Sequence, residues 1–343
     1  MKVRLKEIAE ATGYSINTIS HALRDAPDIS EATKKKIREV AEQLEYIPNL
    51  RASSIKSGKS RVISVILPDI INPHFTIVFR EIERFFSEVG ITPFFMNTNE
   101  SVEDEINAVR LSIGQNVDGV IICPTQANTD SIHLLEKSKI PYVLIGRHFD
   151  ETLPTNYVVC DDTAGAYLAT RHLLSLGHRH IACVKVSDCI SSSRERLSGY
   201  VRALEEAGIA FDESCVLDLA LTDVNNSALI REFLLRTPKC TAILSFNDIL
   251  AYRIINVIMG LGLRIPQDIS VMGFDNICSD YTFPIELSSV SVSKKNMANI
   301  ASELLYNLIK ENPDQQAEEK RQIVLPTRLF LRQTTDWVKE AKE

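Results

Sequence analysis

The chain lacks the features that would place it in a membrane or outside the cell. Its longest apolar runs, such as Val62–Leu67 and Gly119–Cys123, are the length of a strand. A helix needs roughly 20 apolar residues to cross a bilayer. The basic N-terminus leads into no apolar segment of the kind that signal peptides contain. We therefore expect a cytoplasmic protein with no membrane partner.

Cysteines in metal-binding arrangements and catalytic motifs are also lacking. The 7 cysteines of the 343-residue chain show no CxxC or Cys/His ligand spacing, so in a reducing compartment they indicate packing. The sequence contains no GxSxG, GxxxxGK[ST], GxGxxG or HExxH motif. His178 and His180, two residues apart before an expected strand, make a poor metal pair. We expect no enzymatic activity, no metal and no cofactor.

Charge is unevenly distributed along the chain. Residues 1–60 carry eleven Lys and Arg against eight Asp and Glu, whereas the remaining residues carry 27 against 37. A modestly basic head on an acidic body suggests that only the head approaches a polyanion. An ordinary solvated surface is the alternative, and charge alone does not decide between the two.

Residues 1–46 have the pattern of three short helices. Gly13 separates the first from a second that begins after Ser15, and Ser30 precedes the third; serine is a favoured N-cap residue. Two helices joined by a glycine-containing turn are typical of a DNA-binding helix-turn-helix. Residues 47–60 have the composition of a linker.

From residue 61 onward, strand-like runs alternate with amphipathic helices, and the pattern restarts after about residue 160. Strict alternation of this kind predicts parallel sheets covered by helices on both faces. We expect two doubly wound lobes, the first formed by residues 61–160 and 291–322, the second by 161–290 and 323–343. One strand is expected over Ile323–Leu331. A crevice between such lobes is where a ligand would bind.

The second helix of the head carries the side chains suited to reading DNA. If Ile19, Ala22 and Leu23 are buried, Ile16, Asn17, Ser20 and His21 point outward near the helix N-terminus, which enters the major groove in such motifs. Asn17 can pair with adenine, His21 with a guanine acceptor, and Ile16 with a thymine methyl. Ser15, Thr18, Ser30 and Thr33 suit phosphate contacts. An ordinary helical hairpin is the alternative.

Several motifs resemble the LacI/GalR family of bacterial regulators. In the head they are Leu5–Ala11, Ser15–Leu23, Ser30–Thr33 and Leu44–Asn49; in the body they include Leu67–Ile70, Asn72–Phe75, Leu176–Ile181, Arg196–Tyr200, Phe246–Asp248, Gly262–Val271 and Gly273–Asn276. The resemblance covers nearly the whole chain. It implies a helix-turn-helix head joined to a periplasmic-binding-protein-like body.

The resemblance also implies a hinge helix in the DNA minor groove after the Pro48-Asn49 pair. Ile55 takes the position of an apolar wedge between base steps, although burial under the body is an alternative for this residue. The family's usual Ala-Arg pair is Ala52-Ser53 here. The full set of expected DNA contacts adds Leu5, Asn49, Ala52 and Ile55 to the residues of the two capped helices.

In the body, the resemblance implies an effector cleft. His74 and Phe75 would line one wall, and Arg196, Asn247 and Asp275 the other. An arginine donor, a carboxylate acceptor and an amide offering both can satisfy neighbouring hydroxyls of a sugar. Surface ion pairing of Arg196 and Asp275 and core packing of Phe75 are the alternatives.

Two departures from the family pattern bear on the ligand. Leu221 stands where many relatives have an aromatic shelf, so stacking on a sugar face is lost. Gly146 stands where relatives often have Asp, which lets Arg147 reach the ligand and suits an acidic or phosphorylated sugar. Leu221 and Arg147 complete the expected set of effector-binding residues.

We expect a homodimer that binds a near-palindromic double-stranded operator under control of a small effector, a sugar or sugar phosphate. We expect a repressor of carbohydrate metabolism or uptake genes. Release of the operator on ligand binding, which makes an inducible repressor, is the commoner behaviour in the family that the chain resembles. An activator or a co-repressor-dependent regulator would use the same parts. A solute-binding protein without a DNA role would have a signal peptide and lack the helical head.

Overall fold

The computed structural model describes residues 3–47, 59–221, 223, 225–311 and 320–338. The chain divides into two compact units, Met1–Ser60 and Arg61–Glu343. This division falls at the expected start of the body. Among the described residues, no helix is both long enough and apolar enough to cross a membrane.

The first unit contains the three expected helices, α1 (Leu5–Thr12), α2 (Ile16–Leu23) and α3 (Glu31–Gln43). Gly13 ends α1 in the left-handed conformation, with φ 74°. Ser15 and Ser30 cap the next two helices by accepting hydrogen bonds from the backbone N–H groups of Thr18 and Thr33. A small core holds the helices together and contains Ile8, Ile19, Ala22, Ile37 and Ala41. The predicted helix-turn-helix is therefore confirmed.

The second unit begins with a six-stranded sheet in the order β11-β5-β4-β3-β1-β2. Its strands are β1 (Val62–Leu67), β2 (Thr92–Asn97), β3 (Gly119–Ile122), β4 (Tyr142–Ile145), β5 (Tyr157–Cys160) and β11 (Gln322–Leu325), all parallel. Side chains of alternate residues face opposite sides of the sheet. Helices α5 (Pro73–Glu88) and α12 (Lys294–Lys310) cover one side, and α6 (Val102–Gly114) and α7 (Asp130–Ser138) cover the other.

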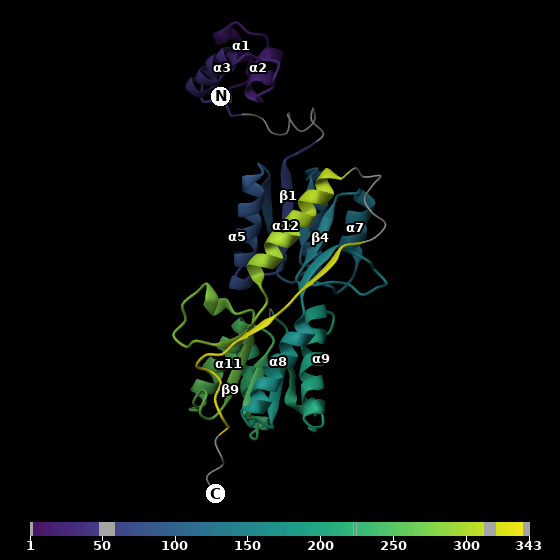
Figure 1. Cartoon of the computed structure of the whole chain (residues 1–343), viewed down its shortest axis with the longest axis vertical. Coiled ribbons are helices and arrows are strands. Elements are labelled where there is room, and N and C mark those ends of the chain that lie inside the picture. Colours follow the sequence, from purple (N-terminus) through teal and green to yellow (C-terminus); the bar gives the residue numbers. More distant parts are fainter. Residues whose placement is uncertain (1–2, 48–58, 222, 224, 312–319, 339–343) are drawn as a thin grey trace. The chain divides into compact units, whose positions relative to one another are not determined.

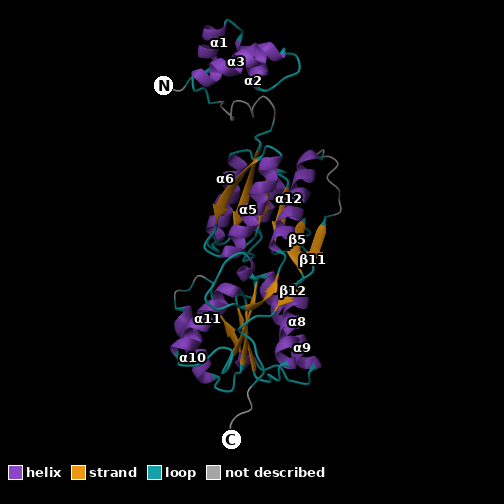
Figure 2. Ribbon diagram, turned by 60° about the vertical axis from the view of Figure 1, so that its left-hand side comes forward, coloured by secondary structure: helices purple, strands orange, loops and turns teal. Residues whose placement is uncertain are grey.

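The second sheet has the order β12-β10-β9-β8-β6-β7. Its strands are β6 (Ile181–Lys185), β7 (Val216–Asp218), β8 (Ala242–Ser245), β9 (Ser270–Phe274), β10 (Ser288–Ser291) and β12 (Arg328–Phe330), and only β12 is antiparallel among these. Helices α8 (Asp162–Ser175) and α9 (Ser191–Glu206) cover one face, and α10 (Asn226–Arg236) and α11 (Asp248–Gly260) the other. Figure 2 shows the two helix-covered sheets of this unit.

The chain passes between the two lobes at three described places: after β5, between β10 and α12, and between β11 and β12. In Figure 1, the yellow β11–β12 segment runs from one lobe to the other. The single strand expected over Ile323–Leu331 is therefore wrong, because Pro326 and Thr327 divide it between the two sheets. The lobe boundary drawn at 322/323 falls three residues too early, and the one at 290/291 lies inside β10.

Two helices have first turns that reach the space between the lobes. Helix α5 starts at Pro73, capped by the side chain of Asn72, which accepts from the backbone N–H of His74. Helix α9 starts at Ser191, and its first three residues are buried serines. Both helices follow the carboxyl ends of parallel strands, which is where α/β folds bind ligands.

Candidate functional site

The outward surface of α2 carries the predicted DNA-reading side chains. Ile16 is 51% exposed although it is apolar, and Asn17 beside it is also exposed. Ser20 is half-buried. The hydroxyls of Ser15 and Thr18 lie 2.8 Å apart. An exposed isoleucine next to an exposed amide suits contact with base edges in the major groove.

His21 has a partner that restricts what its ring can read. Its Nδ1 lies 2.8 Å from Oδ2 of Asp28, and hydrogen bonding to His21 is the main reason that the pKa of Asp28 is lowered. A neutral ring that donates from Nδ1 to Asp28 presents Nε2 as an acceptor, which fits an adenine or cytosine amino group. Only the protonated ring can also donate to a guanine acceptor.

The remaining residues predicted to contact DNA differ in their burial and in their structural roles. Leu5 is half-buried and packs against the core of the first unit, which is a structural role. Ser30 caps α3 by accepting from the backbone N–H of Thr33, and the two hydroxyls lie 2.9 Å apart. Asn49, Ala52 and Ile55 lie outside the described residues, so the hinge helix and its wedge remain predictions.

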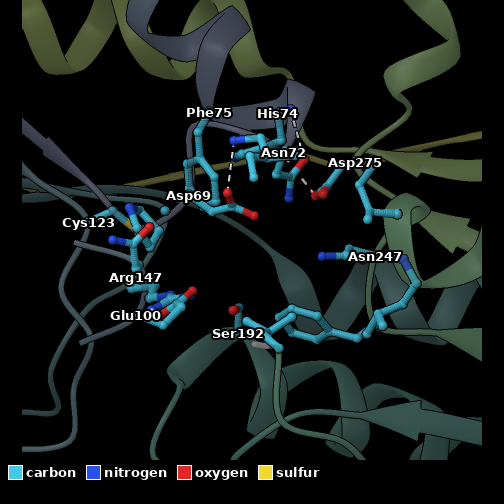
Figure 3. A pocket seen from close by; sticks show the side chains of 18 of the residues that line it. Asp69, Asn72, His74, Phe75, Glu100, Cys123, Arg147, Ser192, Asn247 and Asp275 are labelled. Atoms are coloured by element: carbon cyan, nitrogen blue, oxygen red, sulfur yellow. Dashed lines mark hydrogen bonds and ion pairs between the residues drawn. The ribbon is translucent and has the colours of Figure 1, made fainter. Parts of the chain in front are cut away.

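The second unit contains a cavity of about 360 Å³ between its lobes. All seven predicted effector residues line it: His74, Phe75, Arg147, Arg196, Leu221, Asn247 and Asp275. Figure 3 shows the side chains of His74, Phe75 and Arg147, which belong to the first lobe. The side chains of Asn247 and Asp275 face them from the second lobe. The structure therefore brings together residues that are up to about 200 positions apart in sequence, as parallel strand ends allow.

Arg196 is fixed within the second-lobe wall. Its Nε donates to Asp162 at 3.0 Å, and Nη1 donates to the carbonyl of Phe246. Its guanidinium carbon lies 3.7 Å from the ring centroid of Phe274, a cation–π contact. Burial raises the pKa of Asp162 to about 7, and Arg196 opposes that rise. The arginine is thus rigid, with Nη2 3.9 Å from Asp275.

His74 and Asp275 face each other across the lobe boundary. Nδ1 of His74 lies 3.5 Å from Oδ1 of Asp275, too far for a good hydrogen bond, and this buried nitrogen has no hydrogen-bond partner. Burial lowers the pKa of His74 to about 4, so the ring is neutral at pH 7. Asp275 has φ 104°, and the ammonium of Lys294 holds its carbonyl at 2.6 Å.

Asn247 serves as a helix cap as well as a lining residue. Its Oδ1 accepts from the backbone N–H of Leu250 at 2.8 Å, which caps α11. The amide group still offers its N–H donors. Together with Asp275, an acceptor, it forms a matched donor and acceptor pair on one wall.

Arg147 is buried, and both of its terminal nitrogens donate hydrogen bonds. It donates to the two carboxylate oxygens of Glu100 at 2.8 and 2.6 Å and to the carbonyl of Pro124 at 2.9 Å. An anionic ligand would therefore have to compete with Glu100 for Arg147. Glu100 was not identified from the sequence. Glu100 follows β2 and is far from Arg147 in sequence, so no local pattern identified the pair.

Other lining residues were also missed, among them Asp69, Asn72, Asn99, Glu100, Ser192 and Arg253. Asn72 had a usable signal, since asparagine followed by proline is a good start for a helix. Ser192 lies in the first turn of α9, among three consecutive serines that carry no apolar periodicity.

Comparison with known proteins agrees with this architecture. The family described as "Bacterial regulatory proteins, lacI family" matches residues 4–49. "Periplasmic binding proteins and sugar binding domain of LacI family" matches residues 60–333. The regulator DegA of Bacillus subtilis is 31% identical over 339 residues, covering 98% of each chain. The repressor PurR of Aliivibrio fischeri strain MJ11 is 31% identical over 310 residues, 90% of this chain and 92% of that protein.

Solved structures give the same result. The lac repressor dimer bound to operator and an anti-inducer superposes with a TM-score of 0.82, at 24% identity, over 98% of this chain and 100% of that one. The regulator CcpA of Lactococcus lactis superposes with a TM-score of 0.72 at 27% identity, over 80% of this chain and 98% of that one. For a ribose-bound LacI-family regulator of Enterococcus faecium the TM-score is 0.70 at 27% identity, over 81% of this chain and 100% of that one.

A helix-turn-helix head on a two-lobed body with a cavity between the lobes defines a DNA-binding transcriptional regulator. The chain belongs to the lacI family of bacterial regulatory proteins. Its relatives named above are transcriptional regulators and repressors.

Proposed function

We propose that this protein is a transcriptional repressor of carbohydrate metabolism or uptake genes, and that an uncharged sugar or sugar derivative bound between the lobes controls its affinity for operator DNA. The observation that carries the proposal is the arrangement of Arg196, Asn247 and Asp275 opposite His74 and Phe75 in one cavity. Donors and acceptors placed on two facing walls suit a ring that carries hydroxyls on both sides.

The charges of the lining residues support an uncharged ligand. Among the described residues that line the cavity, three are cationic (Arg147, Arg196 and Arg253) and three are carboxylates (Asp69, Glu100 and Asp275). Arg147 and Arg196 are each hydrogen-bonded to a carboxylate, Glu100 and Asp162 respectively. A phosphorylated sugar, the other candidate, would have to displace Glu100 from Arg147 first.

The apolar part of the wall supports a sugar with little stacking. Phe75 packs edge-on against His74, with ring centroids 4.9 Å apart, and it supplies an apolar surface for ring C–H groups. Leu221 lines the cavity, and the family resemblance implies an aromatic shelf at its position. We expect modest affinity that depends mainly on hydrogen bonds.

We further propose that two copies bind a near-palindromic operator, each head reading one half-site, as twofold symmetry requires. The ligand acts only if its affinity differs between the DNA-competent and incompetent arrangements of the lobes. Such coupling is typically about 1–3 kcal/mol. Release of DNA on ligand binding would make the protein an inducible repressor.

A thermal-shift screen of the full chain over neutral mono- and disaccharides and their phosphates tests the ligand class. A ligand that binds only the native state raises the melting temperature. The proposal requires a neutral sugar whose effect disappears in Asn247→Ala, and that sugar must change the affinity for a duplex selected from a random library. If only phosphorylated compounds shift the melting temperature, the ligand class is wrong.

A reporter experiment separates repression from activation. The selected operator is placed either overlapping a promoter or upstream of it, and expression is measured with and without the protein. Repression predicts lower expression from the overlapping site, relieved by the sugar. Higher expression from the upstream site would instead identify an activator.

A further inference from the structure

The Glu100–Arg147 pair forms a distinct part of the cavity wall. The side chains are 14% and 5% exposed, respectively, so the ion pair is largely removed from solvent but reaches the cavity. In Figure 3 the pair lies beside Cys123, across the open space from Asn247 and Asp275. The pair is therefore on the opposite side of the cavity from Asn247 and Asp275.

We infer that Glu100 is a specificity-determining residue that makes this end of the cavity accept uncharged hydroxyl-bearing groups and reject anions, because it occupies the guanidinium of Arg147. The inference deepens the proposed function and rests on the same cavity. It explains how the cavity excludes anionic ligands. The residues proposed to bind the sugar ring do not determine that exclusion.

The geometry fixes both partners in place. Glu100 has φ 57° and follows Asn99 with φ 50°, so two consecutive left-handed residues turn the chain at the end of β2. Arg147 follows Gly146, whose φ is 73°, at the end of β4. The carbonyl of Pro124, after β3, accepts a further bond from Arg147. The carboxyl ends of three strands of one sheet, β2, β3 and β4, thus hold the pair.

An arginine at this place without its carboxylate would be an anion site. The planar guanidinium matches carboxylate and phosphate oxygens with two parallel hydrogen bonds. In this structure, Glu100 already makes that bidentate contact. A phosphate would have to compete with a carboxylate that is covalently tethered at the site, and it would bring a second negative charge next to Glu100.

The carboxylate of Glu100 can still accept a hydrogen bond from a hydroxyl while it is paired with Arg147. A carboxylate has about four lone-pair sites, and Arg147 uses one on each oxygen. The remaining sites accept hydrogen bonds but cannot donate them. Burial raises the pKa of the neighbouring Cys123 thiol to about 12, so this thiol adds no negative charge. Hydroxyl donors are therefore suited to this end, and anions are not.

There is room for such a group. A side-chain carbon added at Gly146 would meet only the sulfur of Cys123 within 4 Å, at 3.9 Å. The absence of a side chain at Gly146 leaves space that a ligand substituent can fill next to the pair.

The test is direct binding of inorganic phosphate to the full chain, measured by calorimetry and by thermal shift. Glu100→Gln keeps the size of the side chain and removes its charge, so Arg147 loses its counter-ion. We expect phosphate affinity to rise at least about tenfold over the wild type. The double variant Glu100→Gln/Arg147→Gln should return to the wild-type value. Glu103→Gln, exposed on α6 nearby, removes the same charge outside the cavity and should change nothing.

Two results would overturn the inference. One is phosphate binding by the wild type that is as tight as binding by Glu100→Gln, and the other is a gain that persists in the double variant without Arg147. Operator binding by Glu100→Gln, together with its melting temperature, checks that the variant is folded. If it does not fold, Glu100→Asp replaces it, since a shorter carboxylate loosens the bidentate contact and should give a smaller gain in the same direction.

Failure of this inference is distinguishable from failure of the proposed function. The phosphate measurement requires no knowledge of the natural ligand, and it can succeed even if no neutral sugar is found in the screen. Conversely, a sugar that controls operator binding would support the proposed function even if Glu100→Gln gained no affinity for phosphate.

Discussion

The imidazole of His148 and the carboxylate of Glu195 join the two lobes, with Nε2 and Oε1 2.6 Å apart. The contact belongs to a ring of hydrogen bonds across the boundary. The backbone N–H of His148 donates to Ser191, the backbone N–H of Ser191 donates to the side chain of Gln126, and Gln126 donates back to the carbonyl of His148. The hydrogen bond to Glu195 is the largest cause that raises the pKa of His148. The lobes are thus joined by an ion pair that depends on protonation of His148.

Glu195→Gln should weaken this link in a pH-dependent way. Because the folded-state pKa of His148 is raised, the contribution of the ion pair is complete below the ordinary histidine pKa and disappears as the pH rises through the raised value. We expect the variant to be less stable than the wild type by about 0.5–1 kcal/mol in acid, with little difference at alkaline pH. Thermal unfolding of both proteins across this range measures the difference.

Glu205→Gln is the matched control, because Glu205 is exposed on the same helix α9. It should show no pH-dependent difference from the wild type. A Glu195→Gln variant whose loss of stability grew with rising pH would contradict the assigned direction of the pKa shift.

The head could be predicted from sequence because its signals are local. Gly13 ends α1 with a positive φ, and Ser15 and Ser30 each bond a backbone N–H three residues further on. Cap residues, a glycine and a helical apolar pattern lie within a few positions of one another. Such short-range signals do not depend on the rest of the fold.

Features that depend on distant partners could not be predicted in the same way. The run Ile323–Leu331 has the composition of one strand, yet β11 pairs with β5 in one sheet and β12 with β10 in the other. Periodicity carries no information on which sheet a strand joins. Likewise, the sequence drew attention to Arg147 but gave no sign that Glu100 would neutralise it, since their side chains meet only after β2 and β4 enter one sheet. The lining set implied by motif resemblance, in contrast, was brought to one cavity in full.

The close packing of α8 and α9 depends on Gly199. A side-chain carbon at this position would clash with the backbone oxygen of Thr163 and the backbone nitrogen of Tyr167, neither of which can rotate away. Gly199→Ala should destabilise the protein by at least about 1–3 kcal/mol, as overpacking does. Gly260→Ala on α11 meets nothing within 4 Å and should be neutral or stabilising by about 0.4–1 kcal/mol. Urea unfolding compares them; equal effects would show that α8 can move away from α9.

Base recognition by the head is tested at Asn17, which is exposed on α2. Asn17→Ala should cost about 1–3 kcal/mol at one base position of the selected operator and relax the preference there. Gln43→Ala, at the end of α3, removes a similar amide away from the reading surface and should leave binding unchanged. Binding is measured against operators substituted one base pair at a time. If Asn17→Ala weakened binding to all of them equally, the side chain would contact phosphate and not a base.

The neutral state of His74 has a consequence for stability in acid. Burial lowers its folded-state pKa to about 4, from the ordinary value of 6.5. As the pH falls below the ordinary value, the unfolded chain takes up a proton at this position that the folded protein cannot accept, so stability decreases until the lower pKa is reached. His74→Gln removes this penalty and should gain roughly 2–4 kcal/mol relative to the wild type on going from neutral pH to about pH 4. His133→Gln, at an exposed position on α7, should track the wild type in the same urea titrations. If His74→Gln lost stability in acid as steeply as the wild type, the pKa of His74 would not be lowered in the folded protein, and its ring would take up a proton inside the cavity in acid.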